Sequence, residues 1–190
     1  GWNTKKFAEL VADSNPTAIE WLNSPKRYYE WHRITPELRE LQQHATENFR
    51  PIALYYHYRS LAERQYRKHI KSDGETTSDP TAKRNLIALR AIACAEYIKE
   101  KLEFPPLNID ALVDEDTLNS EVTDYIGGLR LQIASGDEGK SQMIGNQFGE
   151  FIEEWLDTHP DQDRLEINGI NRARCNQFID KITDAHESRY

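Results

Sequence analysis

The chain has little of what marks secreted, membrane-spanning or disulfide-stapled proteins. Its two cysteines, Cys94 and Cys175, lie far apart in the 190 residues and make neither a CxxC pair nor a disulfide framework. No apolar run approaches the roughly 20 residues that a membrane-spanning helix needs. The first residues also lack the basic-then-apolar pattern of a signal peptide. We therefore expect a cytoplasmic protein in a reducing environment.

Metal and phosphate-loop motifs are also scarce. The six histidines show no HExxH or other paired spacing, so a zinc site has little support. Residues 134–141, ASGDEGKS, satisfy a loose phosphate-loop pattern. The leading glycine is missing, however, and Asp137 and Glu138 stand where phosphate would be repelled. The sequence therefore predicts no metal ligands and no phosphate loop.

What the chain does have is enough apolar and aromatic material to fold. Hydrophobic residues make up 38% of the sequence and aromatic residues 10%, which argues against disorder and fits one domain over residues 1–190. The formal net charge of −8 is uneven, because residues 1–107 are mildly basic and residues 108–190 strongly acidic. A basic run is a candidate anion-binding surface, although a solvated helix face is the commoner explanation; it contains Arg59, Arg64, Arg67, Lys68, His69 and Lys71.

The stretch over residues 83–106 organises the chain. Between Leu86 and Ile98 only Arg90 and Glu96 interrupt an apolar or small run, which predicts a helix buried on nearly all sides. Lys83, Arg90 and Tyr97 follow at intervals of seven, so they share one stripe, with the two cations about 10 Å apart along the axis. A buried arginine needs a partner. That partner is either an internal carboxylate or an anion such as phosphate in a pocket, and the pattern leaves both open.

The remaining pattern predicts a mainly α fold with at most one or two short strands, one of them at residues 28–31. A helix capped at Asn3 or Thr4 stops at Ser14, and the next begins with Pro16. Further helices are expected over residues 35–48, from 51 to the break at 72–74, over 109–134 as one or two, over 142–156 and over 168–186. The central helix should end at Phe104, before two prolines. Tryptophans are expected in the core or at helix joints.

Three stretches together resemble one known family. They are GWNTKKFAELVADSNPTAIEWLNSP, YYHYRSLAERQYRKHI and KRNLIALRAIACAEYIKEKLEFPP, in the family's order and spacing over about residues 1–135. The family is that of the RNA-ligase-associated predicted nucleotidyltransferases, a YcgL-like branch of the polymerase-β superfamily. The resemblance implies a small mixed sheet with a Gly-Ser motif and metal-binding carboxylates, followed by helices that hold the substrate. Residues 1–33 would then close the nucleotidyltransferase core, and residues 34–190 would form the helical substrate-binding part.

The same resemblance implies Mg²⁺ and a nucleoside triphosphate as cofactor and donor, since two metal ions activate the attacking hydroxyl in such transferases. This sequence has no Gly-Ser turn followed by paired acids. The family commonly has Asp after the Trp, where this chain has Asn3, a poor Mg²⁺ ligand. The chain begins at Gly1, which suggests a cleaved tag or a piece of a longer protein. We therefore expect this chain alone to be inactive as a transferase and to contribute no catalytic residue.

Carried over by position, the motif residues divide into two groups. Asn15, Glu20 and Trp21 are expected to be structural, as a helix joint, a carboxylate that pairs with Arg90 and a packed indole. Four cations are the predicted contacts to nucleotide phosphate or RNA: Lys6, Arg59, Lys83 and Arg90. Nucleotide, RNA and an associated RNA ligase are the implied partners.

Two other functions fit parts of the sequence. A non-enzymatic helical module that presents its basic surface to RNA or protein is the chief alternative. Arg64 and His69 also fit the Arg-x4-His spacing of HEPN-type ribonucleases, although the resemblance explains the same helix more simply. The transferred nucleotide, its acceptor and the oligomeric state cannot be inferred from these patterns.

Overall fold

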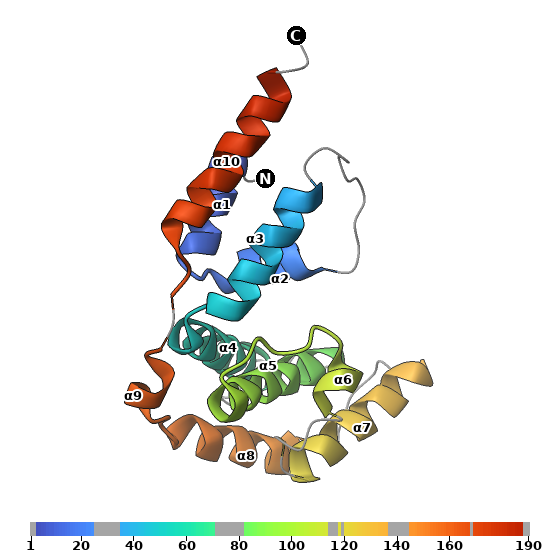
Figure 1. Ribbon diagram of the computed structural model, residues 1–190. Coiled ribbons are helices and arrows are strands. Elements are labelled where there is room, and N and C mark those ends of the chain that lie inside the picture. Colours follow the sequence, from blue (N-terminus) through green and yellow to red (C-terminus); the bar gives the residue numbers. More distant parts are fainter. Residues whose placement is uncertain are drawn as a thin grey trace. The chain divides into compact units, whose positions relative to one another are not determined.

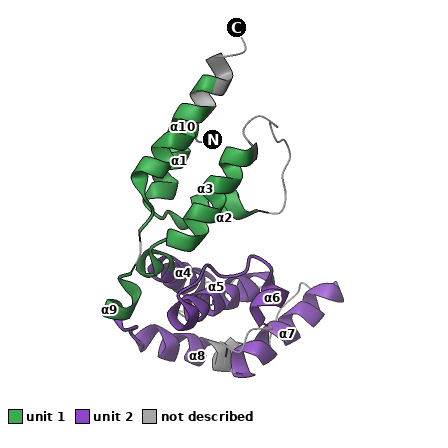
Figure 2. Cartoon of the chain, viewed as in Figure 1, with its two compact units in different colours: residues 1–54, 162–190 green, residues 55–161 purple. Residues whose placement is uncertain are grey.

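The computed structural model describes residues 3–24, 35–70, 82–113, 118, 120–136, 145–167 and 169–187. Within these residues the chain forms ten α-helices and one π-helix, and no strand (Figure 1). The mainly α fold class is thereby confirmed, while the strand expected at residues 28–31 lies outside the described part. The chain divides into two compact units, residues 1–54 with 162–190 and residues 55–161 (Figure 2). No described helix is both long and apolar enough to cross a membrane.

Unit 1 (residues 1–54 and 162–190) begins with two capped helices, α1 (Thr4–Ala12) and α2 (Pro16–Asn23). The Asn3 Oδ1 atom accepts from the Lys6 backbone N–H at 2.8 Å, and Asn15 Oδ1 accepts from that of Ala18 at 3.1 Å. Each cap satisfies an N–H that has no partner within the helix. Ser14 forms the joint in a left-handed conformation, φ +55°. The predicted helix starts at Asn3 and Pro16 are confirmed.

The second layer of unit 1 consists of α3 (Thr35–Asn48) and α10 (Arg172–Glu187). Helix α10 packs against α1 and α3, and apolar side chains of all three are buried there, among them Val11, Leu41 and Phe178. Helix α3 has its predicted bounds. Helix α10 begins four residues later than predicted, because the Asn171 side chain caps it by accepting from the Ala173 N–H at 2.9 Å.

Polar contacts tie α10 to its neighbours within unit 1. Arg172 pairs with Asp13 at the end of α1, and Lys181 Nζ lies 3.4 Å from Glu40 Oε2 on α3. The backbone N–H of Asn171 donates to His44 Nε2 at 3.1 Å. Burial, and next the charge of Arg174, lowers the pKa of His44. A neutral ring is what the acceptor role of Nε2 requires.

A short helix, α9 (Gln162–Leu165), belongs to unit 1 and was not predicted. It lies between the helices predicted over residues 142–156 and 168–186. Leu165 is its buried residue. Four residues are too few to show an apolar period, so no periodic pattern predicts this helix.

Unit 2 (residues 55–161) is built around α5 (Ala82–Lys101), which carries eleven buried residues. Helix α4 (Pro51–Gln65) runs into the π-helix η2 (Tyr66–Ile70). Helix α5 packs against η2, α6 (Ile109–Val113) and α7 (Ser120–Ala134). The expectation that this apolar helix is the core of its surroundings is confirmed.

The end of α5 differs from the prediction. The helix stops at Lys101, before Phe104 and the two prolines. Leu102 takes a left-handed conformation, φ +58°, and its N–H donates to the Ile98 carbonyl at 3.0 Å. A left-handed residue directly after the last turn ends a helix without help from proline.

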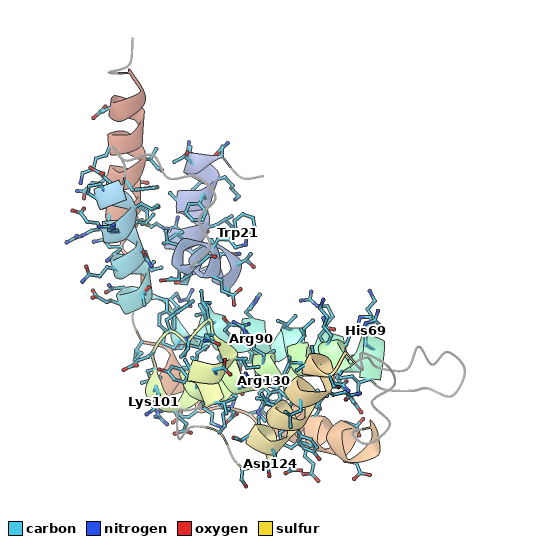
Figure 3. All side chains as sticks on the ribbon, turned by 90° about the vertical axis from the view of Figure 1, so that its right-hand side faces the viewer. Trp21, His69, Arg90, Lys101, Asp124 and Arg130 are labelled. Atoms are coloured by element: carbon cyan, nitrogen blue, oxygen red, sulfur yellow. The ribbon has the colours of Figure 1, made fainter. Side chains whose placement is uncertain are left out.

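Helix α7 buries Val122, Ile126 and Leu129, the apolar face that its periodicity predicts. Helix α8 (Gly145–Asp157) buries Trp155, as expected of a core tryptophan, and packs against η2. Trp21 is different, because 58% of its surface is exposed, so the expectation of a packed indole was wrong (Figure 3). The outward face of α2 carries it, which the short period of an eight-residue helix did not reveal. Trp2 and Trp31 lie outside the described residues.

Candidate phosphate-binding site

Two segments that match the family motifs meet in unit 2. Arg84, in the first turn of α5, donates from Nη1 to Nδ1 of His69, near the end of η2, at 2.8 Å. Arginine only donates, so His69 Nδ1 must be the acceptor. Burial, and then the charges of Arg84 and Lys68, lowers the pKa of His69. The ring is therefore neutral near pH 7, with its proton on Nε2.

We call Lys68, His69, Lys83 and Arg84 the basic cluster. Lys68 and Lys83 are exposed, and Arg84 is half-buried. The cluster carries three positive charges with a neutral imidazole, in a chain whose formal net charge is −8. The first N–H groups of α5 add the positive end of a helix dipole beside these charges. Such a surface attracts phosphate through charge-assisted hydrogen bonds.

The predicted stripe on α5 runs from solvent into the core. Lys83 is exposed and belongs to the basic cluster, Arg90 is half-buried, and Tyr97 is buried. Tyr97 Oη donates to Glu103 Oε2 at 3.3 Å. Figure 3 marks His69 and Arg90, both in unit 2. Lys83 directly precedes Arg84, which pairs with His69, whereas Arg90 lies two turns further along the helix.

Arg59 is placed at the end of α8. Its Nη1 donates to the Thr158 carbonyl at 2.7 Å, and its Nη2 donates to the Leu156 carbonyl. The guanidinium lies 5.5 Å from the centre of the Trp155 ring. These contacts satisfy carbonyl groups that a helix end leaves without partners. Both terminal nitrogens therefore serve the scaffold, and a contact of Arg59 with phosphate stays a prediction.

Trp155 continues this network to α5. Its Nε1 donates to Glu96 Oε1 at 2.8 Å, and Glu96 also pairs with Lys99. Glu96 was one of two charged interruptions in the apolar run, and the contact explains why the carboxylate is tolerated there. The network connects α4, α5 and α8 and so holds the scaffold that carries the basic cluster.

A hollow beside Arg59 is unsuited to phosphate. Tyr66 Oη donates to Glu153 Oε1 at 2.7 Å, and Arg67 Nη2 lies 2.6 Å from Glu63 Oε1. Three carboxylates therefore offset two arginines around this opening, whose lining consists of Arg59, Glu63, Tyr66, Arg67, Glu153, Leu156 and Asp157. The charge balance favours the basic cluster as the anion-binding surface of unit 2.

Lys6 lies in unit 1, on α1, and is exposed. Its Nζ is 3.9 Å from Glu9 Oε2, a weak pair at the surface. The other three predicted cations lie in unit 2. A role of Lys6 in binding phosphate stays a prediction.

The described residues do not form a site that fits the Mg²⁺ ions implied by the resemblance. In the described part of the chain no group of three or more His, Cys, Asp or Glu side chains comes together in a way that could hold a metal. Asn3, at the family's Asp position, caps α1 with its side-chain oxygen. A site for two Mg²⁺ ions needs several oxygen ligands around each ion. No catalytic step through a metal is therefore derived for this chain.

Two polar residues of the first turn of α5 were missed by the sequence analysis. Arg84 pairs with His69, and Asn85 is buried with an exposed fraction of 1%. The seven-residue spacing of Lys83, Arg90 and Tyr97 pointed to Lys83 instead. The signal available was topological, because two consecutive helices that pack against each other in opposite directions place the end of one beside the start of the next.

Comparison with known proteins places the chain in a family. It is 28% identical over 153 residues to the uncharacterized protein YcgL of Bacillus subtilis, covering 80% of this chain and 56% of that protein. The chain thus spans little more than half the length of this curated relative. No solved structure matches it. A family model described as "RNA repair pathway DNA polymerase beta family", RlaP, matches residues 1–180, and the chain belongs to that family.

Proposed function

We propose that this chain supplies the helical, substrate-holding part of a nucleotidyltransferase of RNA repair. In this proposal the basic cluster binds the phosphates of a nucleotide or of RNA. The observation that supports it is the 2.8 Å contact between Arg84 of one family motif and the neutral ring of His69 in another, where His69 directly follows the cation Lys68. Family membership supports the reaction class, transfer of a nucleotidyl group from a nucleoside triphosphate with Mg²⁺.

The proposal assigns roles to the predicted cations. Lys83 holds phosphate together with Lys68 and Arg84, and Arg90 extends the same helix face. The first role of Arg59 is to stabilise the end of α8 by donating to its carbonyl groups. Lys6 contributes from the segment that would border the catalytic sheet of a longer protein, with residues 34–190 as the substrate-binding part. An RNA ligase of the same repair pathway is the proposed partner.

Replacing Lys83 by Met tests the proposal, because Met keeps the aliphatic bulk and removes the charge. We expect the affinity for labelled ATP or a short RNA, titrated at fixed salt, to fall about tenfold. Arg84→Met should have a similar effect. Lys101→Met is the matched control, since Lys101 is an exposed lysine at the opposite end of the same helix. Unchanged affinity in both cluster variants would overturn the proposal.

The second candidate is a non-enzymatic helical module that binds RNA, favoured by the lack of a metal-binding group in the described residues. Both candidates use the basic cluster. They differ in the longer protein, where a nucleotidyltransferase incorporates labelled nucleotide in the presence of Mg²⁺ and a binding module does not.

A further inference from the structure

The contact between His69 and Arg84 holds only while the imidazole ring is neutral. Arg84 Nη1 donates to His69 Nδ1 at 2.8 Å. A protonated imidazole carries a hydrogen on both nitrogens, and arginine has no acceptor. Uptake of a proton by His69 would therefore leave two donors facing each other across this distance, and the contact would open.

The ring of His69 lies among positive charges. Lys68 precedes it on η2, and Arg84 contacts it from α5. After burial, the charges of Arg84 and Lys68 are what lowers the pKa of His69. A nearby like charge disfavours the charged form of a titratable group, and an anion that pairs with the cations removes that effect. The protonation of His69 is thus sensitive to an anion on the basic cluster.

Other charged groups of the elements around η2 have partners of their own. Helix α8 packs against η2 and brings Glu153, whose Oε1 accepts from Tyr66 Oη at 2.7 Å. Arg67, on η2 itself, has Nη2 2.6 Å from Glu63 Oε1. Neither carboxylate is among the groups that act on the ring of His69.

A phosphate on the basic cluster would reverse the preference of the ring. Its negative charge offsets the charges of Lys68 and Arg84, so a positive imidazole becomes favourable there. The Nδ1–H of that ring and the Nη1–H of Arg84 then stand side by side as donors, and one phosphate oxygen can accept from both. Only a small rotation of the two side chains is needed, as is common on binding.

We propose that His69 is a phosphate-binding residue of the basic cluster, which takes up a proton from solvent as the phosphate binds and donates to it beside Arg84. This proposal rests on the proposed function, because it takes phosphate binding by the basic cluster as given. His69 accepts from Arg84 in the free chain and donates to the phosphate in the complex. Binding is then linked to uptake of one proton, so the affinity rises as the pH falls.

The test measures affinity at pH 8 and pH 6, at one salt concentration, for the 190-residue chain. The ligands are a ten-nucleotide oligo(U) RNA, whose phosphodiesters and bases do not titrate in this range, and UTP. We expect the RNA to bind about tenfold more tightly at pH 6, the size of effect that one added charge-assisted hydrogen bond gives. Calorimetry in two buffers of different ionisation enthalpy measures the proton uptake directly. The terminal phosphate of UTP titrates itself, so its pH dependence is compared with that of the variants.

His69→Gln is the deciding variant, because glutamine offers Arg84 an acceptor and cannot take up a proton. We expect the ratio of RNA affinities at pH 6 and pH 8 to fall to about one. His69→Lys carries a fixed charge, so it should bind RNA at pH 8 about tenfold more tightly than His69→Gln and be equally independent of pH. A merely structural ring would make both variants weaker alike. His159→Gln is the matched control, as an exposed histidine outside the basic cluster, and a thermal melt at both pH values checks each fold.

The possible failures are distinct. Tighter RNA binding at pH 6 that survives in His69→Gln overturns this proposal and leaves phosphate binding by the basic cluster intact. RNA affinity of the wild-type chain that does not change between pH 8 and pH 6 also overturns it. Affinity for RNA and UTP that neither Lys83→Met nor Arg84→Met reduces would instead overturn the proposed function, and this proposal with it. Binding of UTP without RNA, with a pH dependence that His69→Gln reduces, identifies the ligand as a free nucleotide and supports the role of His69.

Discussion

The guanidinium of Arg59 lies over the ring of Trp155, 5.5 Å from its centre, while its terminal nitrogens donate to the last carbonyls of α8. A cation over an aromatic face and a helix end with satisfied carbonyls are each favourable. The same indole donates to Glu96 on α5. One arginine thus connects α4 to α8, and through Trp155 to α5.

Replacing Arg59 by Met should therefore destabilise the fold. Loss of the charge-assisted hydrogen bonds removes about 1.5–3 kcal/mol from the free energy of unfolding, measured by urea denaturation. Arg64→Met is the control, because Arg64 is an exposed arginine of the same helix. We expect it to change the unfolding free energy by less than about 0.5 kcal/mol. Equal stability of the two variants would contradict the scaffold role of Arg59.

Stability should fall as the solution is made acidic, beginning near pH 6.5. Burial lowers the pKa values of both His44 and His69 below their ordinary value of 6.5. In the unfolded chain these rings take up protons near pH 6.5, whereas in the folded chain they do so only at lower pH. The unfolded state therefore binds more protons, and stability rises with pH in this window. The loss of stability on acidification is complete once the pH has fallen below the lowered pKa values that the two rings have in the folded chain.

Thermal melting between pH 8 and pH 5 measures this effect. His44→Gln should reduce the pH dependence, because glutamine cannot titrate and can still accept from the Asn171 N–H. His159→Gln is the control, since His159 is an exposed histidine of the same chain. A pH dependence unchanged by His44→Gln, alone and combined with His69→Gln, would show that these two rings are not its source.

This chain should not incorporate labelled nucleotide from a nucleoside triphosphate in the presence of Mg²⁺. The described residues hold no group of acidic side chains fit for a metal, and the sequence has no Gly-Ser turn with paired acids. The assay follows transfer of labelled phosphate to RNA on a gel, with commercial poly(A) polymerase as the positive control. Robust incorporation by the 190-residue chain would refute the view that it supplies only the substrate-binding part.

Arg64 and His69 should not cleave RNA. A ribonuclease of the HEPN type needs the histidine free to act on a 2′-hydroxyl, whereas His69 Nδ1 accepts from Arg84. We expect Arg64→Ala and His69→Ala to leave any residual RNA cleavage at the level of the wild-type chain, scored on a labelled oligonucleotide. A drop in cleavage in both variants would revive the ribonuclease function.

Most helices were predictable because their signals are local. Asn3 and Asn15 cap the helices that follow them, and α3 has its predicted bounds. The burial of α5 followed from its apolar run. The exposed Trp21 was not predictable, since a tryptophan in a short helix gives the same pattern whether it faces the core or solvent.

The candidate site was predictable in part. Lys83 was singled out from its spacing on the helix, and its contact with phosphate stays a prediction. Arg84 was not singled out, because its contact with His69 depends on which helix end lies beside it. Arg59 shows the reverse case: a cation in a basic run is expected at the surface, but here its guanidinium contacts carbonyls of a helix almost 100 residues away in sequence. Contacts of that range are set by tertiary packing, which no local pattern records.

Leu102 has a consequence for protein engineering. A leucine with φ +58° occupies a conformation that glycine adopts without steric penalty. Glycine at this position would relieve about 1 kcal/mol of backbone strain but would also make the unfolded chain more flexible, and the two effects have opposite signs. The natural leucine thus limits the conformations open to the unfolded chain at the point where α5 ends, and the boundary of the central helix depends on the backbone of one apolar residue.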